Sequence, residues 1–144
     1  MPTQRDNPYA NFNFVVELGG EEVGAFSEVE LPEATIEVIE YREGGDLTSG
    51  ARKLSGRVSY ANVVLKRGLS GRTELWDWFK ATRDGTLQRR DVTITLLDEA
   101  RKPVQRWLLR DAWPTRFSSS RLDGRGNEVV IETLELAYDG LEIE

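Results

Sequence analysis

The side chains best placed for acid–base chemistry are carboxylates, because the chain contains neither histidine nor cysteine. A thiolate nucleophile, a histidine base, a Cys/His zinc site and a disulfide framework are therefore excluded. Three carboxylate pairs stand close in sequence: Glu21/Glu22, Glu28/Glu30 and Asp98/Glu99. Glycosidase chemistry needs two carboxyl groups held across a cleft. The first and third pairs adjoin predicted turns, so solvated surface carboxylates are the favoured interpretation.

Two glycine-containing stretches resemble phosphate-binding loops only in part. "GLSGRTE" (68–74) opens a predicted helix, where anions bind readily, but it lacks the lysine and the spacing of a Walker loop. "DGRGNE" (123–128) is too short for a dinucleotide fingerprint and precedes a strand. No Ser-x-x-Lys occurs either. We therefore predict that the protein is not an enzyme and uses no cofactor or metal.

Length and charge set the broad class of protein. A chain of 144 residues is about one domain long, and at this size it can fold without metal or disulfide staples. Its formal net charge of −6 disfavours specific nucleic-acid binding. No apolar run approaches the roughly 20 residues of a membrane helix, and the first residues do not resemble a secretory signal.

Alternation of apolar and polar residues predicts a mostly β protein. Residues 12–18 alternate, Gly19–Gly20 permit a hairpin turn, and a return strand is expected over 22–31, ended by Pro32. In 35–41 the apolar residues change parity, which indicates a β-bulge or a strand buried on both faces. Further strands are predicted at 57–67, 91–99, 104–114 (stopped by a proline) and 129–143.

One helix is predicted at about 71–83, with Ser70 as its cap and Gly85 at its end. Helical spacing places Leu75, Trp78 and Phe79 on the face toward the core. Of the remaining tryptophans, Trp107 fits an inward strand position, whereas Trp76 and Trp113 could reach an interface. About seven antiparallel strands and this helix give a single domain over 1–144, a sandwich or small barrel of two packed antiparallel sheets flanked by one helix.

The stretch "EYREGGDLTSGARKLSG" (40–56) is long and polar for a connection between two strands. Its acidic residues come first and its basic residues last, apart from an early arginine. The charged residues that follow the first strand, up to the residue directly after this stretch, are Arg42, Glu43, Asp46, Arg52, Lys53 and Arg57. One interpretation is a surface hairpin with exposed ion pairs worth about 0–1 kcal/mol each. The other is a docking arm that contacts an acidic patch on another copy, as in heterologous assembly.

Several motifs occur in an order that resembles one family. They are "YREGGD" (41–46), "RKLSGR" (52–57), "LKRG" (65–68), "LWDWFK" (75–80), "LLDEARKPVQRWLLRDAWP" (96–114) and "GNEVVIETLELAYDGLEIE" (126–144). Together they resemble the tail-tube proteins of contractile phages and phage-derived contractile injection systems. The type VI secretion tube protein (Hcp) is similar in fold. The resemblance covers nearly the whole chain.

The resemblance implies a structural role. Subunits of this kind form hexameric rings whose sheets join around a lumen, and the rings stack into an inner tube that sheath contraction drives through a target envelope. The segment 42–56 would be the extended hairpin loop that reaches an adjacent ring. Implied partners are other copies, the sheath protein, baseplate or tube-initiator proteins, tail-terminator proteins and lumenal cargo. The implied location is a particle assembled in a prokaryotic cytoplasm and then retained or released.

Two alternatives remain open at this point. A tube-initiator protein at the baseplate would share the fold. A small ligand-binding barrel would also show alternating inward faces, although the long charged stretch and the helix in mid-chain fit it less well.

Overall fold

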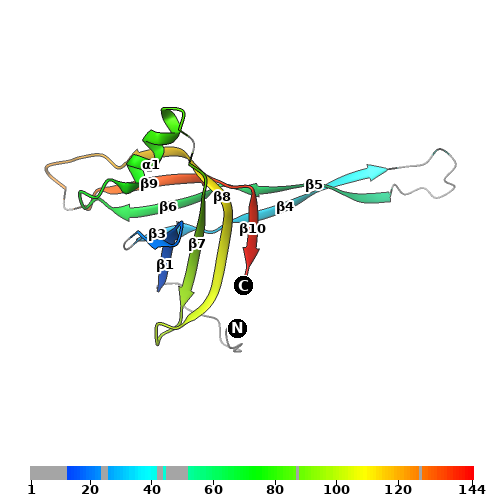
Figure 1. Cartoon of the computed structure of the whole chain (residues 1–144), viewed down its shortest axis with the longest axis horizontal. Coiled ribbons are helices and arrows are strands. Elements are labelled where there is room, and N and C mark those ends of the chain that lie inside the picture. Colours follow the sequence, from blue (N-terminus) through cyan, green and yellow to red (C-terminus); the bar gives the residue numbers. More distant parts are fainter. Residues whose placement is uncertain (1–12, 24–25, 42–43, 45–51, 87, 127) are drawn as a thin grey trace.

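The computed structural model describes residues 13–23, 26–41, 44, 52–86, 88–126 and 128–144. Within these residues the chain forms ten strands and one helix. A body carries most of them, and a two-stranded ribbon projects from it (Figure 1). The elements are β1 Phe14–Leu18, β2 Glu21–Glu22, β3 Glu28–Glu30, β4 Glu33–Tyr41, β5 Arg52–Ala61, β6 Val63–Gly68, α1 Glu74–Arg83, β7 Arg90–Leu97, β8 Pro103–Ser119, β9 Ile131–Ala137 and β10 Gly140–Ile143.

The body is an antiparallel sheet of eight strands in the order β2-β1-β7-β8-β9-β6-β3, with β10 paired to β8. The long strand β8 belongs to both halves of this sheet. Its first part pairs with β7 and β10, and its last part, from Trp113, pairs with β9. The two halves cross in Figure 1 and enclose one core that draws side chains from both. The expected mostly β fold with two antiparallel sheets and one helix is confirmed, although the separate second sheet is the two-stranded ribbon β4–β5.

The core follows from strand alternation. In β6 every second residue is buried, and the same is true of β9. Val63 and Leu65 thereby meet Leu134 and Leu136 across the β6–β9 ladder, all fully buried. The part of the chain that the structure describes contains no closed barrel. The ligand-binding barrel considered above is therefore not supported.

The N-terminal hairpin forms as predicted, but its return strand does not. Gly19 and Gly20 have φ of 60° and 91°, the left-handed values that the two-residue turn requires. Only the two residues of β2 then pair with β1. The chain continues to β3, which pairs with β6 instead. The single strand predicted over 22–31 is thus wrong, because its two ends serve opposite edges of the sheet.

The helix begins later than predicted. Thr73 stands at its N-terminal boundary and makes no side-chain capping hydrogen bond, so the predicted Ser70 cap is wrong. Gly71 has a φ of 84°, which no right-handed helix accommodates, and the helix begins only at Glu74. At the other end Gly85 follows the helix with a φ of 92°, as expected of a terminating glycine.

Three predicted strands have different bounds. The strand predicted over 57–67 is divided into β5 and β6, which lie in different sheets. The strand predicted over 129–143 is divided into β9 and β10. The strand predicted to stop at Pro114 instead continues to Ser119. Proline is tolerated there because the strand has a register shift between Pro114 and Arg116 and no partner on its other side within the described residues.

A buried arginine joins the helix to the sheet. Arg67 is 3% exposed, and its guanidinium donates to the carboxylates of Glu132 on β9 and Glu74 on the helix. It also donates to the carbonyl oxygen of Val23 at 3.1 Å. Burial alone would lower the pKa of Arg67, but the hydrogen bonds to Glu74 and Glu132 raise it. The group therefore stays charged and fixes the start of α1 against β6 and β9.

Candidate functional site

The ribbon β4–β5, called the arm from here on, extends away from the body (Figure 1). Eight residue pairs join its strands, from Glu33↔Ala61 at the base to Tyr41↔Arg52 at the far end. All nine residues of β4 are exposed. The residues of β5 are exposed too, apart from partly buried Gly56 and Tyr60. The predicted loop at 42–56 is therefore shorter than expected, because residues 52–56 belong to β5.

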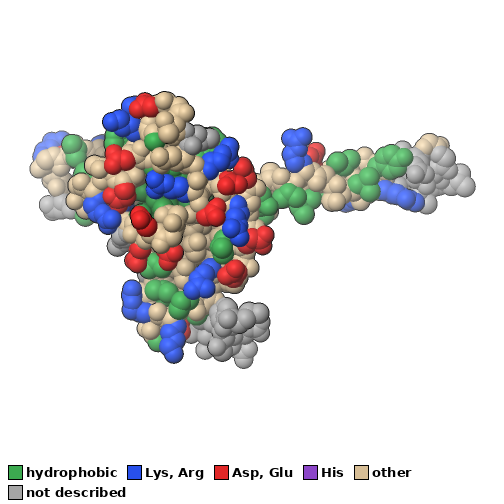
Figure 2. Space-filling view, viewed as in Figure 1, with side chains coloured by type: hydrophobic (Ala, Val, Ile, Leu, Met, Phe, Trp, Pro, Cys, Tyr) green, Lys and Arg blue, Asp and Glu red, His purple; other side chains and the backbone are tan. Residues whose placement is uncertain are grey.

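The arm carries apolar side chains on both faces. Cross-strand partners share a face, so Ile36 and Val58 lie together on one face and Ile39 and Leu54 on the other. Val38 is the most exposed of these, at 63%. Figure 2 shows the apolar atoms spread along the arm. Such residues normally pack against something, so the arm is expected to be covered by a partner.

A β-bulge lies in the middle of the arm. Gly56 and Arg57 together oppose the single residue Glu37, since the register shifts between Ile36 and Val38. A Cβ added to Gly56 would lie 2.8 Å from the Cδ1 atom of Ile39, so a larger residue would have to displace that side chain. The bulge that the parity change in 35–41 indicated is thus confirmed. The alternative of a strand buried on both faces is wrong for the isolated chain.

The charged residues predicted for this stretch fall into two groups. Arg42, Glu43 and Asp46 lie outside the described residues. Arg52, Lys53 and Arg57 lie on β5 and are exposed. Lys53 is the cross-strand partner of Glu40. Among the described residues, however, no ion pair involves any of the three cations.

The base of the arm is attached to the body by an aromatic pair. The Tyr138 hydroxyl donates a hydrogen bond of 2.8 Å to the carbonyl oxygen of Ala61. The rings of Tyr60 and Tyr138 lie 5.5 Å apart between centroids. Burial and then the neighbouring Tyr60 raise the pKa of Tyr138. The hydroxyl therefore remains a donor at neutral pH and holds the arm at its root.

Four strands of the body form a half-sheet with two free edges. Its order is β8-β9-β6-β3, where β8 contributes the part from Trp113 to Ser119. Within the described residues, neither β3 nor this part of β8 has a second partner strand. Unpaired N–H and C=O groups at such an edge are available to pair with another chain. Strand alternation alone does not reveal these edges, although the proline inside β8 is a usable signal for one of them.

One face of this half-sheet is polar and open. Two rows of side chains cross it: Glu30–Val64–Glu135–Arg116 and Glu28–Lys66–Thr133–Ser118. Lys66 and Glu28 form an ion pair at 3.0 Å. Most of these residues line a shallow hollow of about 250 Å³. We call this surface the polar face. It bears both signs of charge and no apolar group larger than valine among those eight residues.

The opposite face of the half-sheet is covered by the helix and the other half of the body. Leu75 and Trp78 of α1 are buried, and Phe79 is half-buried. Phe79 packs with Trp76 and with Phe117 of β8, at centroid distances of 5.8 and 6.4 Å. The Trp78 indole donates to the carbonyl oxygen of Gln88 at 2.7 Å. The remaining tryptophans, Trp107 and Trp113, are half-buried.

Within the described residues there is no group of three or more acidic, histidine or cysteine side chains placed to hold a metal ion. In the same part of the chain, no helix has the length and apolarity to cross a membrane. The described residues present three surface features: an arm with apolar faces, two free sheet edges and a polar face.

Comparison with known proteins gives these surfaces a context. Residues 10–142 match the family model described as T4-like virus tail tube protein gp19. The chain belongs to this tail tube family. No curated protein sequence matches it.

Solved structures show the same fold. A chain in the structure of the anti-feeding prophage baseplate, 6-fold symmetrised, is 29% identical, with a TM-score of 0.84 and coverage of 97% of both chains. A chain in the sheath–tube complex of an extracellular contractile injection system in its extended state is 27% identical, with a TM-score of 0.85 and coverage of 96% of this chain and 93% of the other. Hcp1 from Flavobacterium johnsoniae, 13% identical with a TM-score of 0.57, shares the fold and covers 90% of this chain and 93% of that one. The protein is a structural tube subunit of this class.

Proposed function

We propose that copies of this chain join edge to edge into six-membered rings, and that the rings stack into the inner tube of a contractile particle. The observation that carries the proposal is the half-sheet β8-β9-β6-β3 with its two free edges. A sheet that is free at both edges is an aggregation hazard unless it is capped or closed. A ring closes it, because the last copy pairs with the first.

The strand directions suit such a ring. All pairings in the half-sheet are antiparallel, so its two outer strands, β3 and the end of β8, run in opposite directions. If copies are related by rotation about a common axis, β3 of one copy meets β8 of the next in an antiparallel ladder. The contact joins unlike surfaces and is therefore heterologous, the type that closes rings.

Charge supports the same pairing. On the polar face, both rows end in a carboxylate at the β3 edge, from Glu28 or Glu30. At the β8 edge they end in Arg116 and Ser118. Opposite charges across neighbouring strands stabilise a ladder by about 0.2–1 kcal/mol per pair, and like charges destabilise it. An acidic edge that meets a basic edge favours the head-to-tail arrangement over two copies of the same edge.

The closed ring would place the polar face toward the lumen and α1 outward. The hollowed polar face lies on the side of the half-sheet away from the helix. A passage lined by Glu28, Glu30 and Glu135 together with Lys66 and Arg116 presents mixed charge and few apolar groups. Such a wall favours passage of a polar cargo over its retention. The outward helix side would meet a sheath.

The partners follow from this arrangement. They are other copies, a surrounding sheath, and the baseplate and terminator proteins at the two ends, with cargo in the lumen. The similar solved structures include a sheath–tube complex, a baseplate and a tube-terminating cap. The protein acts without catalysis. The tube is assembled in the cytoplasm of a prokaryote as part of a particle that is then retained or released.

A tube-initiator protein is the second candidate. The similarity to a chain in a baseplate structure favours it specifically. An initiator forms one ring and templates others, whereas a main tube subunit adds ring upon ring. The number of rings that the pure protein forms on a preassembled baseplate separates the two roles.

Electron microscopy of the protein, purified and co-expressed with its neighbouring gene products, tests the proposal. Rings with six-fold end views or stacked tubes are expected. Monomers in both samples would contradict it. The charge reversals Glu30→Arg and Arg116→Glu should each weaken ring formation, and the double variant should restore it. If the wild-type chain forms rings but the double variant forms none, the ring is supported and the proposed pairing of Glu30 on β3 with Arg116 on β8 is wrong.

A further inference from the structure

Asp-Gly steps are places where a protein chain can rearrange its own backbone. The glycine nitrogen can attack the carboxyl carbon of the preceding side chain, because glycine has no Cβ to obstruct the approach. The chain contains no Asn-Gly step and three Asp-Gly steps, Asp84–Gly85, Asp123–Gly124 and Asp139–Gly140. The three aspartate side chains are 53%, 45% and 62% exposed, in that order, so access to water does not distinguish them.

The second of these steps lies in the connection between β8 and β9, at the end of the molecule farthest from the arm (Figure 1). The Gly126 N–H donates to the Asp123 carbonyl oxygen at 3.1 Å and closes a four-residue turn. The Arg125 N–H donates to the Oδ1 atom of Asp123 at 3.0 Å. Within the described residues the Gly124 N–H has no acceptor, so its nitrogen is free to react.

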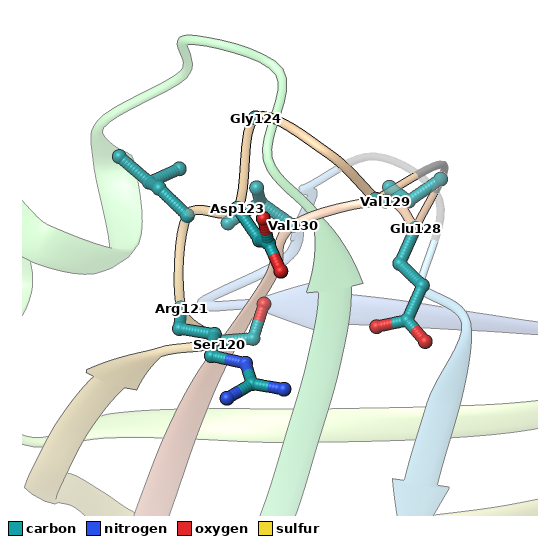
Figure 3. Close-up of a pocket in the computed structure, with 9 residues that line it drawn as sticks. Ser120, Arg121, Asp123, Gly124, Glu128, Val129 and Val130 are labelled. Atoms are coloured by element: carbon teal, nitrogen blue, oxygen red, sulfur yellow. The ribbon is translucent and has the colours of Figure 1, made fainter.

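The turn favours attack on the side chain of Asp123. The hydrogen bond from Arg125 folds this side chain forward along the chain, past the Gly124 nitrogen. The same N–H can stabilise the negative charge that develops on Oδ1 during attack. A Cβ added to Gly124 would meet no atom within 4 Å, so the backbone has room to move. In Figure 3 the Asp123 side chain points to the inside of the loop, toward a surface hollow of about 540 Å³ that water can enter.

The step after the helix is held in a different way. The Gly85 N–H donates to the carbonyl oxygen of Thr82 at 3.2 Å, so the attacking nitrogen is already engaged. Both carboxylate oxygens of Asp84 accept from the Arg83 guanidinium, at 2.9 and 3.4 Å. This pair turns the carboxylate toward the preceding residue and away from the following nitrogen.

The step before β10 is held by the sheet. The Asp139 N–H donates to the carbonyl oxygen of Arg110 at 2.8 Å, and Gly140 pairs with Arg110 in the ladder. A Cβ added to Gly140 would lie 3.4 Å from the Arg110 side chain, so this backbone is packed on its neighbour. The Asp139 carboxylate is also ion-paired with Arg89 at 2.8 Å. A backbone fixed on both sides cannot rotate into the geometry of attack.

We propose that Asp123 is a site of spontaneous isomerisation to isoaspartate, and that it reacts faster than the other two Asp-Gly steps. The Gly124 nitrogen attacks Cγ of the protonated carboxyl group. The N–Cγ bond forms, the Cγ–OH bond breaks, and one water leaves with the amide proton. The resulting five-membered succinimide takes up one water at either carbonyl. Addition at Cγ restores aspartate, and addition at the main-chain carbonyl gives isoaspartate of unchanged mass.

Isoaspartate changes the surface at this end of the molecule. The main chain then runs through Cβ and Cγ of residue 123 and is longer by a methylene group, and the free carboxylate lies on Cα. The turn closed by the Gly126 N–H cannot keep its geometry, and Leu122, an apolar side chain 82% exposed, moves with it. The exposed α-carboxylate is the group that isoaspartate methyltransferases modify, so the aged chain becomes a substrate for such an enzyme.

Peptide mapping of the folded full-length chain, aged for weeks at physiological temperature and mildly acidic pH, tests the proposal. Isoaspartate at 123 should accumulate about tenfold faster than at 84 or 139, because the folded structure restrains only those two. In urea the three steps should react at similar rates. Equal rates in the folded chain would overturn the proposal. The same order of rates in urea would overturn it too, since the sequence rather than the turn would then set the order.

Matched variants identify the attacking nitrogen. Gly124→Ala fits the loop without a clash and should slow isomerisation at 123 by about tenfold, because its Cβ obstructs attack. Gly126→Ala, the same change two residues away, meets only ordinary contacts and should react as the wild type does. Asp123→Glu should incorporate no methyl group at this position from an isoaspartate methyltransferase and labelled methyl donor. An unchanged rate in Gly124→Ala, or an equal loss in Gly126→Ala, would overturn the proposal.

Discussion

The arm and the β6–β9 ladder of the body are both antiparallel pairs that contain β-branched residues, yet they differ in whether their apolar side chains are buried. In β6 and β9 every second residue is buried, and the buried residues include Val63, Leu65, Leu134 and Leu136. In β4 all nine residues are exposed, including Ile36, Val38 and Ile39. Within the described residues no layer covers either face of this ribbon, which accords with the proposal that other chains cover it.

The comparison also separates two kinds of stability. The folded body is stabilised by contacts within the subunit, namely the hydrophobic core and the buried Arg67 network. The arm gains almost nothing from its own fold beyond its ladder and the Tyr138 contact at its base. Substitutions in the core of the body should therefore affect the folding of the monomer, and substitutions in the exposed arm should affect assembly.

The largest effect is expected at Trp78. Alanine there should lower the free energy of unfolding by about 3–5 kcal/mol, because it leaves a large cavity and removes the hydrogen bond to the Gln88 carbonyl. The arm control Tyr41→Ala should cost less than about 0.5 kcal/mol, as a surface change. Urea unfolding of both monomers measures the difference. A loss below about 1 kcal/mol at Trp78 would show that the helix face is wrongly assigned.

Removal of the buried charge comes next. Arg67→Met should cost about 3 kcal/mol, since it leaves the Glu132 carboxylate buried without its partner. Lys66→Met, on the neighbouring residue, removes only an exposed ion pair with Glu28 and should cost about 0–1 kcal/mol. Equal costs in chemical denaturation would mean that the Arg67 network contributes no more than a surface pair.

A matched leucine pair sharpens the contrast between arm and body. Leu134→Ala should destabilise the monomer by about 2 kcal/mol or more, because Leu134 is fully buried. Leu54→Ala, the same change on the exposed arm, should leave monomer stability within about 0.5 kcal/mol but weaken assembly. Calorimetry and sedimentation report the two properties separately. A destabilised Leu54→Ala monomer would show that the arm packs on its own body.

The smallest effect concerns pH. Burial alone would raise the pKa of Glu74, but the hydrogen bond from Arg67 and the nearby charges lower it below its usual value of 4.5. A lowered pKa in the folded state contributes stability that is present above the unfolded-state pKa and is lost as the pH falls through the folded-state value. Stability should therefore decrease below pH 4.5, and Glu74→Gln should flatten part of that decrease. An identical pH profile in the variant would contradict this role of Glu74.

A further charge reversal, Arg52→Glu with Lys53→Glu, belongs to the arm side of the comparison. Both side chains are exposed and have no ion pair in the described chain, so the monomer should fold normally. Stacking of rings should be blocked, because these cations would face the next ring. Normal tubes from this variant, seen by electron microscopy, would show that the two cations are not docking contacts.

Local patterns were sufficient where a segment forms its structure from its own residues. The glycine pair after β1 and the glycine that ends α1 each depend on a few consecutive residues and were predicted correctly, and the bulge in the arm was one of two alternatives that the sequence offered. The start of the helix was missed because Gly71 turns the chain after the residue expected to cap it. Where a strand ends depends on its partners, and for this reason the divisions between β5 and β6 and between β9 and β10 could not be predicted.

The sequence by itself determined the class of chemistry and the family. Without histidine or cysteine it excludes thiol and imidazole catalysis, and the ordered motifs over residues 41–144 identify a tail-tube protein. Only the tertiary structure decided which surfaces remain uncovered. The polar face, which lies between the free edges of β3 and β8, combines residues far apart in the chain, such as Glu30 and Arg116. Burial and edge pairing are properties of the packed sheet, because a strand pattern specifies two faces but not what lies above them.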